Sequence, residues 1–184
     1  MTEAGRAMAA RGIATATFDF PYVIARRKVP DRPSVLEDAW REAIEAARRE
    51  PALSGLPLFI GGKSMGGRMA SHVAASGRGI EGVRGLIFLG YPLHPAGKPA
   101  QRRDQHLPDI RLPMLFVQGT RDAFGTAEEI RALLPSLAAP AELFVVEGGD
   151  HSFKVPARIA KPDVVLAAVF DVAARFAGTY AGHT

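Results

Sequence analysis

The chain has 184 residues, the size of one domain with a sizeable core. Its composition, 47% hydrophobic and 23% charged, excludes wholesale disorder, and the absence of cysteine excludes a disulfide scaffold, thiolate metal sites and a thiol nucleophile. The net charge is +4, but the basic residues are scattered and lack aromatic stacking groups, so we expect no nucleic-acid partner. No apolar run approaches the ~20 residues of a membrane span and no apolar leader opens the chain, so we expect a cytoplasmic protein without a membrane anchor.

Short apolar runs alternate with helical patterns along the chain. In chain order they predict a helix over Ala4–Ala10, a strand over Ile13–Phe20, a loop over Val23–Pro33, a helix from Ser34 to Arg49, a strand over Leu56–Gly61, a helix over Met65–Ala75, strands over Val83–Gly90 and Pro113–Gln118, a helix over Ala127–Leu134, a strand over Leu143–Glu147 and a helix over Asp163–Phe176. Strands separated by helices form parallel βαβ units. We therefore predict a single α/β domain over residues 1–184, a three-layer sandwich around a mainly parallel sheet.

Two local signals set boundaries in the first third of the chain. Pro21 should end the strand that begins at Ile13, because proline cannot donate to a ladder. Ser34 with Glu37 three residues on has the spacing of a capping box and should begin the next helix.

The end of the Leu56–Gly61 run carries the most specific motif. The residues Gly62-Lys63-Ser64-Met65-Gly66 read G-x-S-x-G, directly after a strand and directly before a helix. In this context the glycines allow a strained turn that presents a serine hydroxyl at the top of the sheet. The N–H of Met65, at the helix N-terminus, could then stabilise an oxyanion.

Two other interpretations of this turn were weighed. A phosphate-binding loop requires a glycine where Pro57 stands, and proline also lacks the N–H that a phosphate cradle uses. The second alternative is a glycine-rich turn with an idle serine, which the motif alone leaves open.

An acid and a histidine follow two later strands. Asp122 comes after Pro113–Gln118, and His151 follows the last strand. Each alone has an ordinary explanation, since aspartate in a loop is a common turn former and a loop histidine is usually solvated. The order Ser, Asp, His over successive strand ends is nevertheless that of α/β hydrolases, and it predicts Ser64, Asp122 and His151 as catalytic residues. Asp150 adjoins His151 too closely in sequence to brace its ring.

The loop between Val83–Gly90 and Pro113–Gln118 supplies further candidates. His94, His106 and Arg102 could overhang the site and contact substrate. Arg102, Arg103 and His106 would favour an anionic substrate, and the alternative is a solvated basic loop. The sequence contains no clustered metal-ligand motif, so we expect neither a metal nor a cofactor.

Several segments together resemble a known family. GGKSMGGRMA, FVQGTRDAFG and GGDHSF, with FDFPY upstream, look like the small α/β hydrolases related to dienelactone hydrolase. More narrowly, they are similar to a group of short bacterial α/β hydrolases that includes a testis-expressed protein and a subunit of a histone-acetyltransferase complex. The resemblance implies Ser64 as nucleophile, His151 as general base, Asp122 as the orienting acid and the N–H of Met65 as one oxyanion donor.

The chain departs from the family's pattern at its start and in its lid. Relatives usually begin with a strand and a His-Gly loop that supplies the second oxyanion donor, and here neither that strand nor a lid between Tyr91 and Leu112 is expected. The ordered Ser64, Asp122 and His151 predict a serine hydrolase that works through an acyl-enzyme, and the short link in place of a lid predicts an open site for a small or exposed ester or thioester. The alternative is a weakly active or inactive scaffold with a regulatory role, and either form is compatible with a homo-oligomer.

Overall fold

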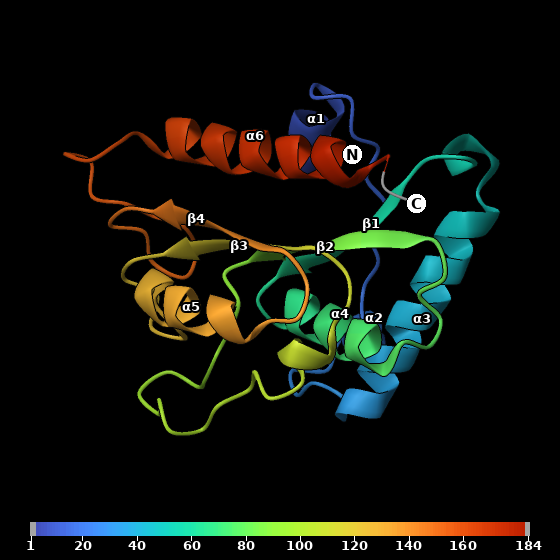
Figure 1. The fold of residues 1–184 in the computed structure, drawn as a ribbon, viewed down its shortest axis with the longest axis horizontal. Coiled ribbons are helices and arrows are strands. Elements are labelled where there is room, and N and C mark those ends of the chain that lie inside the picture. The colour runs from blue at the N-terminus through green and yellow to red at the C-terminus, as the bar shows by residue number, and fades with distance from the viewer. Residues whose placement is uncertain (1–2, 183–184) are drawn as a thin grey trace.

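The computed structural model describes residues 3–182, and within them it contains a four-stranded parallel sheet (Figure 1). The strands are β1 (Leu58–Lys63), β2 (Val83–Leu89), β3 (Met114–Gly119) and β4 (Ala141–Val146), and they lie side by side in that order. In the register, Phe88 of β2 aligns with Phe116 of β3, and Val117 aligns with Phe144 of β4. All four carboxyl ends therefore point to one edge of the sheet, where the chemistry of such folds is found.

Helices cover both faces of the sheet, as the sequence predicts. The helices of more than one turn are α1 (Glu3–Ala9), α3 (Pro33–Arg49), α4 (Met65–Ser76), α5 (Ala127–Leu133) and α6 (Pro162–Tyr180). Figure 1 shows α1 and α6 on one face and α3, α4 and α5 on the other. This arrangement is a three-layer sandwich around a parallel sheet, as the sequence predicts.

Each face of the sheet has its own hydrophobic core. On the α4 and α5 side the core includes fully buried Phe88, Phe116 and Met114. On the α6 side, Phe176 packs under the sheet beside Leu115 and Val117. Both faces of β3 are thus buried, which explains why its sequence is a continuous apolar run rather than an alternating one.

The strand predicted over Ile13–Phe20 is wrong. The structure assigns these residues to no strand, and among residues 3–182 the one strand paired with β1 is β2. In this segment Phe18 packs edge-on against Trp40 of α3 at a centroid distance of 4.9 Å. A β-branched sequence favours an extended backbone, but a strand also needs a hydrogen-bonded neighbour, and that requirement is invisible in the local pattern.

Several boundaries also differ by a few residues from those predicted, and two of these differences, at α2 and α3, have a physical reason. Pro21 begins a single helical turn, α2 (Pro21–Ile24), within the region expected to be strand end and loop. Helix α3 begins at Pro33 with Arg32 as its N-cap and has no side-chain cap, so the capping box at Ser34 is wrong. Proline is favoured at the first helical position because its missing N–H would have no acceptor there, and this preference moves the start ahead of Ser34.

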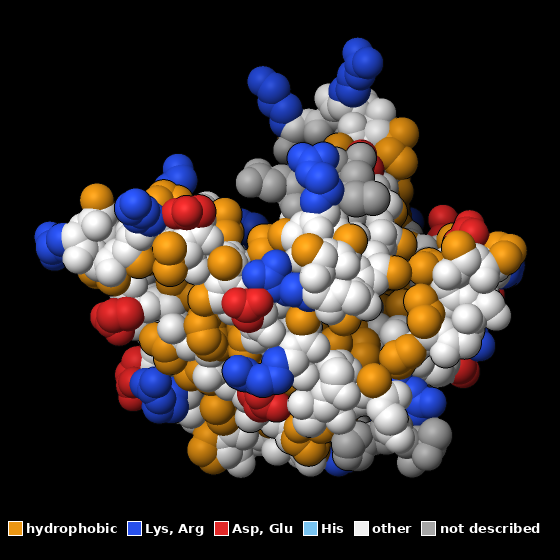
Figure 2. Space-filling view, turned by 90° about the horizontal axis from the view of Figure 1, so that it is seen from above, with side chains coloured by type: hydrophobic (Ala, Val, Ile, Leu, Met, Phe, Trp, Pro, Cys, Tyr) orange, Lys and Arg blue, Asp and Glu red, His pale blue; other side chains and the backbone are white. Residues whose placement is uncertain are grey.

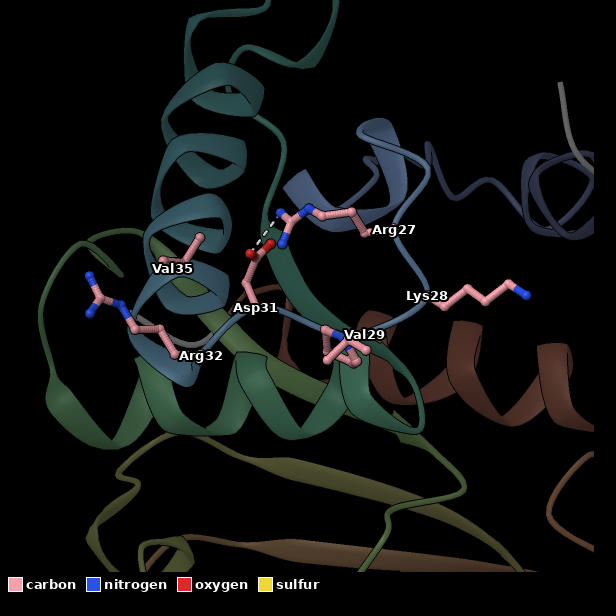
Figure 3. Close-up of a pocket in the computed structure, with 7 residues that line it drawn as sticks. Arg27, Lys28, Val29, Asp31, Arg32 and Val35 are labelled. Atoms are coloured by element: carbon pink, nitrogen blue, oxygen red, sulfur yellow. Dashed lines mark ion pairs between the residues drawn. The ribbon is translucent and has the colours of Figure 1, made fainter.

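The chain between α2 and α3 carries a local ion pair. Arg27 binds the Oδ1 of Asp31 at 2.7 Å, and Figure 3 shows this pair while the side chain of Arg32 points away from it. These residues, together with Val29 and Val35, line an open hollow of about 610 Å³. The second carboxylate oxygen of Asp31 is buried without a hydrogen-bond partner.

Exposed hydrophobic side chains gather in the segment that precedes α3. Val23, Ile24 and Val29 are 40%, 71% and 74% exposed, and Phe18 is 37% exposed. On the face seen in Figure 2, lysine and arginine side chains lie among acidic and hydrophobic ones. None of the helices in residues 3–182 is long and apolar enough to cross a membrane.

Candidate active site

Ser64 lies at the carboxyl end of β1, immediately before α4. Its backbone adopts φ 51° and ψ −119°, a left-handed conformation that non-glycine residues rarely occupy. The strain is held by the sheet, because the Ser64 N–H donates to the carbonyl of Leu89 on β2 at 3.1 Å. Strain of this kind, stored where a strand turns into a helix, presents the hydroxyl at the top of the sheet.

The turn depends on glycine at two positions, Gly62 and Gly67, for different reasons. Gly62 has φ 137°, which strains any residue with a side chain. A Cβ on Gly67 would lie 2.6 Å from the carbonyl oxygen of Gly62, whereas a Cβ on Gly66 would meet no atom within 4 Å. Within the turn itself, the backbone of Gly67, one residue beyond the G-x-S-x-G motif, therefore lies too close to that of Gly62 to leave room for a side chain.

Ser64, His151 and Asp122 form one chain of hydrogen bonds. The Oγ of Ser64 lies 2.9 Å from Nε2 of His151, and Nδ1 of the same ring lies 2.8 Å from Oδ2 of Asp122. The Asp122 side chain is fully buried and that of His151 is 21% exposed. The phenyl ring of Phe124 packs against the imidazole at a centroid distance of 4.5 Å. A serine bonded to an imidazole that is in turn held by a carboxylate can act as a nucleophile.

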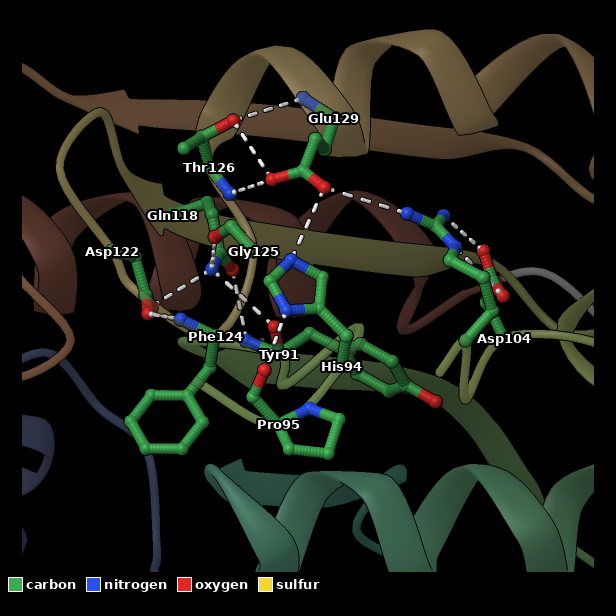
Figure 4. Close-up of polar contacts among 11 residues, drawn as sticks. Tyr91, His94, Pro95, Asp104, Gln118, Asp122, Phe124, Gly125, Thr126 and Glu129 are labelled. Carbon is green, nitrogen blue, oxygen red and sulfur yellow. Dashed lines mark hydrogen bonds and ion pairs between the residues drawn. The ribbon is translucent and has the colours of Figure 1, made fainter. Parts of the chain in front are cut away.

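Gln118 holds the carboxylate of Asp122 in place (Figure 4). This fully buried side chain donates from Nε2 to Oδ2 of Asp122 at 2.9 Å and to the carbonyl of Gly125 at 2.6 Å, and its Oε1 accepts from the N–H of Tyr91 at 2.8 Å. The other carboxylate oxygen of Asp122 accepts from the N–H of Phe124 at 2.8 Å. The sequence analysis missed Gln118, although a lone amide in the apolar run Met114–Gly119 is a signal for it.

Gly90, directly after β2, lies against the histidine and the acid in a backbone conformation that favours glycine. A Cβ at this position would lie 3.4 Å from Nδ1 of His151 and 3.5 Å from Oδ2 of Asp122, and the backbone has φ 69°. The sequence gives no local sign of this role, because it depends on two loops that arrive from later in the chain.

Two groups next to Ser64 contribute charge or dipoles. Met65 is the first residue of α4, so its N–H has no acceptor within the helix and is free to meet an oxyanion. Lys63 donates from Nζ to the carbonyl of His151 at 2.5 Å, which ties the histidine loop to the serine turn. Burial lowers the pKa of Lys63, and the charges of Asp122 and Asp150 oppose that shift.

His94 and Arg102 lie beside α5, outside the lining of the cavity at Ser64. His94 is 5% exposed, with Nε2 3.2 Å from Oε1 of Glu129 (Figure 4). Arg102 pairs with Asp104 and also reaches Glu129 at 3.5 Å. Burial raises the pKa of Glu129, but hydrogen bonds from Thr126 and His94 outweigh it and lower the pKa overall. Thr126 and Glu129 also form a capping box at the start of α5.

His106 likewise faces α4 instead of the cavity. Its Nε2 lies 2.7 Å from the hydroxyl of Ser71, and its ring lies 4.0 Å from that of His72. Burial, reinforced by the positive charges of His72 and Arg68, lowers the pKa of His106 to about 4. The imidazole is therefore neutral at physiological pH and acts as part of the packing between the loop and α4.

A cavity of about 310 Å³ opens directly beside Ser64. Its walls come from the chain before α3, from the start of α4 and from the loops after β2 and β3. The lining residues are Pro30, Asp31, Pro33, Leu36, Ser64, Met65, Arg68, Pro92, Arg103 and Phe124. In the part of the chain that the structure describes, no group of three or more acidic or histidine side chains is arranged to hold a metal ion.

Comparison with known proteins agrees with this geometry. A family model described as "Alpha/beta hydrolase domain" matches residues 1–178, and the chain belongs to that family. Dienelactone hydrolase from Anabaena variabilis superposes with a TM-score of 0.71 at 20% identity, over 97% of this chain and 77% of the other. An esterase domain from Rhodothermus marinus gives a TM-score of 0.67 at 19% identity, over 97% and 80% of the two chains. At these identities, the likeness establishes a shared fold.

Proposed function

We propose that the protein is a serine hydrolase of the carboxylesterase type, which acts on a small or exposed ester or thioester. One observation carries this proposal: the continuous hydrogen-bond chain from Ser64 through His151 to buried Asp122. Membership of the α/β-hydrolase family and structural neighbours named as a dienelactone hydrolase and an esterase domain support a hydrolase.

In the first half of the reaction, Ser64 Oγ attacks the acyl carbonyl while Nε2 of His151 takes the hydroxyl proton. Asp122 holds the ring through Nδ1 and stabilises the imidazolium that forms. The negative charge that develops on the carbonyl oxygen is stabilised by the N–H of Met65. The tetrahedral intermediate then collapses, and His151 returns the proton to the leaving alcohol or thiol.

In the second half, water hydrolyses the acyl-enzyme. His151 removes a proton from the water, which attacks the acyl carbon, and the same proton returns to Ser64 Oγ as the acid leaves. The 21% exposure of the His151 side chain provides a path for that water. No cofactor enters either half.

The test is hydrolysis of 4-nitrophenyl acetate by the purified chain and by Ser64→Ala. Replacing the nucleophile should lower kcat by at least about 10³, with the melting temperature unchanged within a few degrees. The matched control is Ser152→Ala, which removes an exposed hydroxyl one residue from His151. Turnover by Ser64→Ala equal to that of the unaltered protein would disprove the assignment.

A second candidate function is a scaffold or regulatory interaction protein that retains the fold. It is favoured by the free edge of β1 and by the exposed hydrophobic side chains of Val23, Ile24 and Val29. A folded protein without esterase activity that purifies in a stable complex would support it. Esterase turnover by a protein without a partner would count against it.

Three further assignments remain predictions that accompany this proposal. They are a cytoplasmic location, the absence of a nucleic-acid partner and a homo-oligomeric state. The free β1 edge is the feature through which copies of the chain could associate, and sedimentation analysis of the purified protein tests the oligomer.

A further inference from the structure

The cavity beside Ser64 contains two guanidinium groups without partners. Arg68 and Arg103 both line it, and neither forms an ion pair among the residues that the structure describes. The Nε of Arg68 is buried with no hydrogen bond. A buried donor without an acceptor costs free energy, and an anionic ligand would remove that cost.

The charge of Arg103 also acts on Arg68. Burial lowers the pKa of Arg68, and the neighbouring charge of Arg103 lowers it further. Two like charges that line the same cavity are unfavourable without a counter-ion. Their proximity is therefore best explained by a ligand that carries negative charge.

The one acid in the lining does not neutralise them. Asp31 pairs through Oδ1 with Arg27 at 2.7 Å and forms no ion pair with Arg68 or Arg103. Its carboxylate would repel a dianion more strongly than a monoanion. The charges of the two arginines and of Asp31 together therefore favour a ligand carboxylate over a phosphate group.

The cavity takes the acyl side of the substrate. His151 must give its proton to the leaving group, so that group departs toward Nε2, and His151 is not among the cavity-lining residues. Arg68 follows Ser64 by one helical turn, a rise of about 6 Å along α4. An acyl chain of a few methylenes attached to Ser64 would place a terminal carboxylate near both guanidinium groups.

We propose that Arg68 and Arg103 form a carboxylate subsite, so that the preferred substrates are esters or thioesters of short dicarboxylic acids, with the free carboxylate held in this cavity. The inference rests on the proposed function for its chemistry and on the cavity for its specificity. Arginine binds a carboxylate through two parallel N–H bonds, which gives orientation as well as affinity.

The activity test compares two esters that differ in one charge, mono-4-nitrophenyl adipate and methyl 4-nitrophenyl adipate. The charged ester should have a kcat/KM at least about tenfold higher. Arg68→Met and Arg103→Met should each move that ratio toward one. Arg102→Met is the matched control, because Arg102 pairs with Asp104 outside the cavity and its loss should leave the ratio unchanged.

A binding test separates this proposal from the hydrolase assignment. Ser64→Ala, which cannot turn over, is titrated calorimetrically with monomethyl adipate and with dimethyl adipate. Tighter binding of the monoacid, lost when Arg103→Met is added, supports the subsite even if no ester is hydrolysed. Turnover with no preference for the charged ester would support the hydrolase assignment and overturn the carboxylate subsite. Inorganic phosphate and acetate are then compared as competitors of monomethyl adipate. Stronger competition by phosphate than by acetate would overturn the assignment to a carboxylate.

Discussion

Two regions of the molecule differ in how fully their polar groups are hydrogen-bonded. One is the edge of the sheet that carries Ser64, Asp122 and His151, and the other is the segment of residues 13–33. At the sheet edge, both oxygens of Asp122 and three polar contacts of Gln118 are satisfied inside the protein. In residues 13–33 no residue is paired in a strand, large hydrophobic side chains are exposed and an oxygen of Asp31 has no partner.

This contrast shows where the fold fixes geometry. A buried polar group is costly unless bonded, so a satisfied network permits one arrangement of Asp122 and His151. The segment of residues 13–33 is held by a few contacts, such as Phe18 on Trp40, and can vary at low cost. Substitutions at the sheet edge should therefore have large effects, and comparable ones in residues 13–33 small effects.

The largest effect is expected at Gly67. A Cβ there would lie 2.6 Å from the Gly62 carbonyl oxygen, so Gly67→Ala forces the serine turn to shift and should cost about 1–3 kcal/mol in the free energy of unfolding. Gly66→Ala is the control: it meets no atom within 4 Å and replaces a helical glycine, so it should be neutral or stabilising. Urea unfolding measures both. Equal loss of stability in the two variants would contradict the turn geometry.

The next effect is expected at Gln118. Gln118→Leu removes one hydrogen bond to Asp122 and leaves the N–H of Tyr91 without its acceptor, so the acid should hold His151 less firmly. We expect kcat for 4-nitrophenyl acetate to fall about tenfold, with KM nearly unchanged, because positioning acts on the reacting state. Gln118→Glu, which keeps an acceptor for Tyr91 but repels Asp122, should shift the pH profile of kcat. A Gln118→Leu enzyme with full kcat would rule out the positioning role.

A smaller effect concerns pH. His106 has a pKa of about 4 in the folded protein and an ordinary value of 6.5 when unfolded. The unfolded chain therefore binds this proton at a higher pH, so stability is complete above about pH 6.5 and is lost as the pH falls toward 4. His106→Gln should show a smaller fall in unfolding free energy between pH 7.5 and 5 than the unaltered protein. Identical falls in the two proteins would exclude His106 as the cause.

The smallest effect is expected in residues 13–33. Ile24 and Val29 are 71% and 74% exposed, so Ile24→Ser and Val29→Ser should change the free energy of unfolding by less than about 0.5 kcal/mol. Thermal unfolding of both variants checks this. A loss above 1 kcal/mol in the monomeric protein would show that these side chains are covered, and would remove the contrast between the two regions.

The sequence predicts the elements whose signals are local. β3 and α4 are recognisable because continuous apolar runs and the Ser64 turn mark them within a few residues. Ile13–Phe20 has an equally strong β pattern and is no strand, because pairing depends on a distant neighbour. Pro33 outweighs Ser34 at the start of α3 through a preference for the first helical position.

The same division holds for the candidate site. The sequence predicts Ser64, Asp122 and His151 as site residues because each of them follows a predicted strand. Gly90 and Gln118 act only through loops that fold back onto them, so the chain alone does not reveal their contacts. Arg102 and Arg103 are neighbours in sequence, and only the tertiary structure separates the residue paired with Asp104 from the one that lines the cavity.

The most direct test of the central claim is labelling of the folded protein with a fluorophosphonate, located by peptide mass spectrometry. An activated serine reacts with this reagent and an ordinary one does not. The account predicts a single label on the peptide containing Ser64, absent in Ser64→Ala and strongly reduced in His151→Gln. A folded protein that takes no label, or takes it on another serine, would contradict the account.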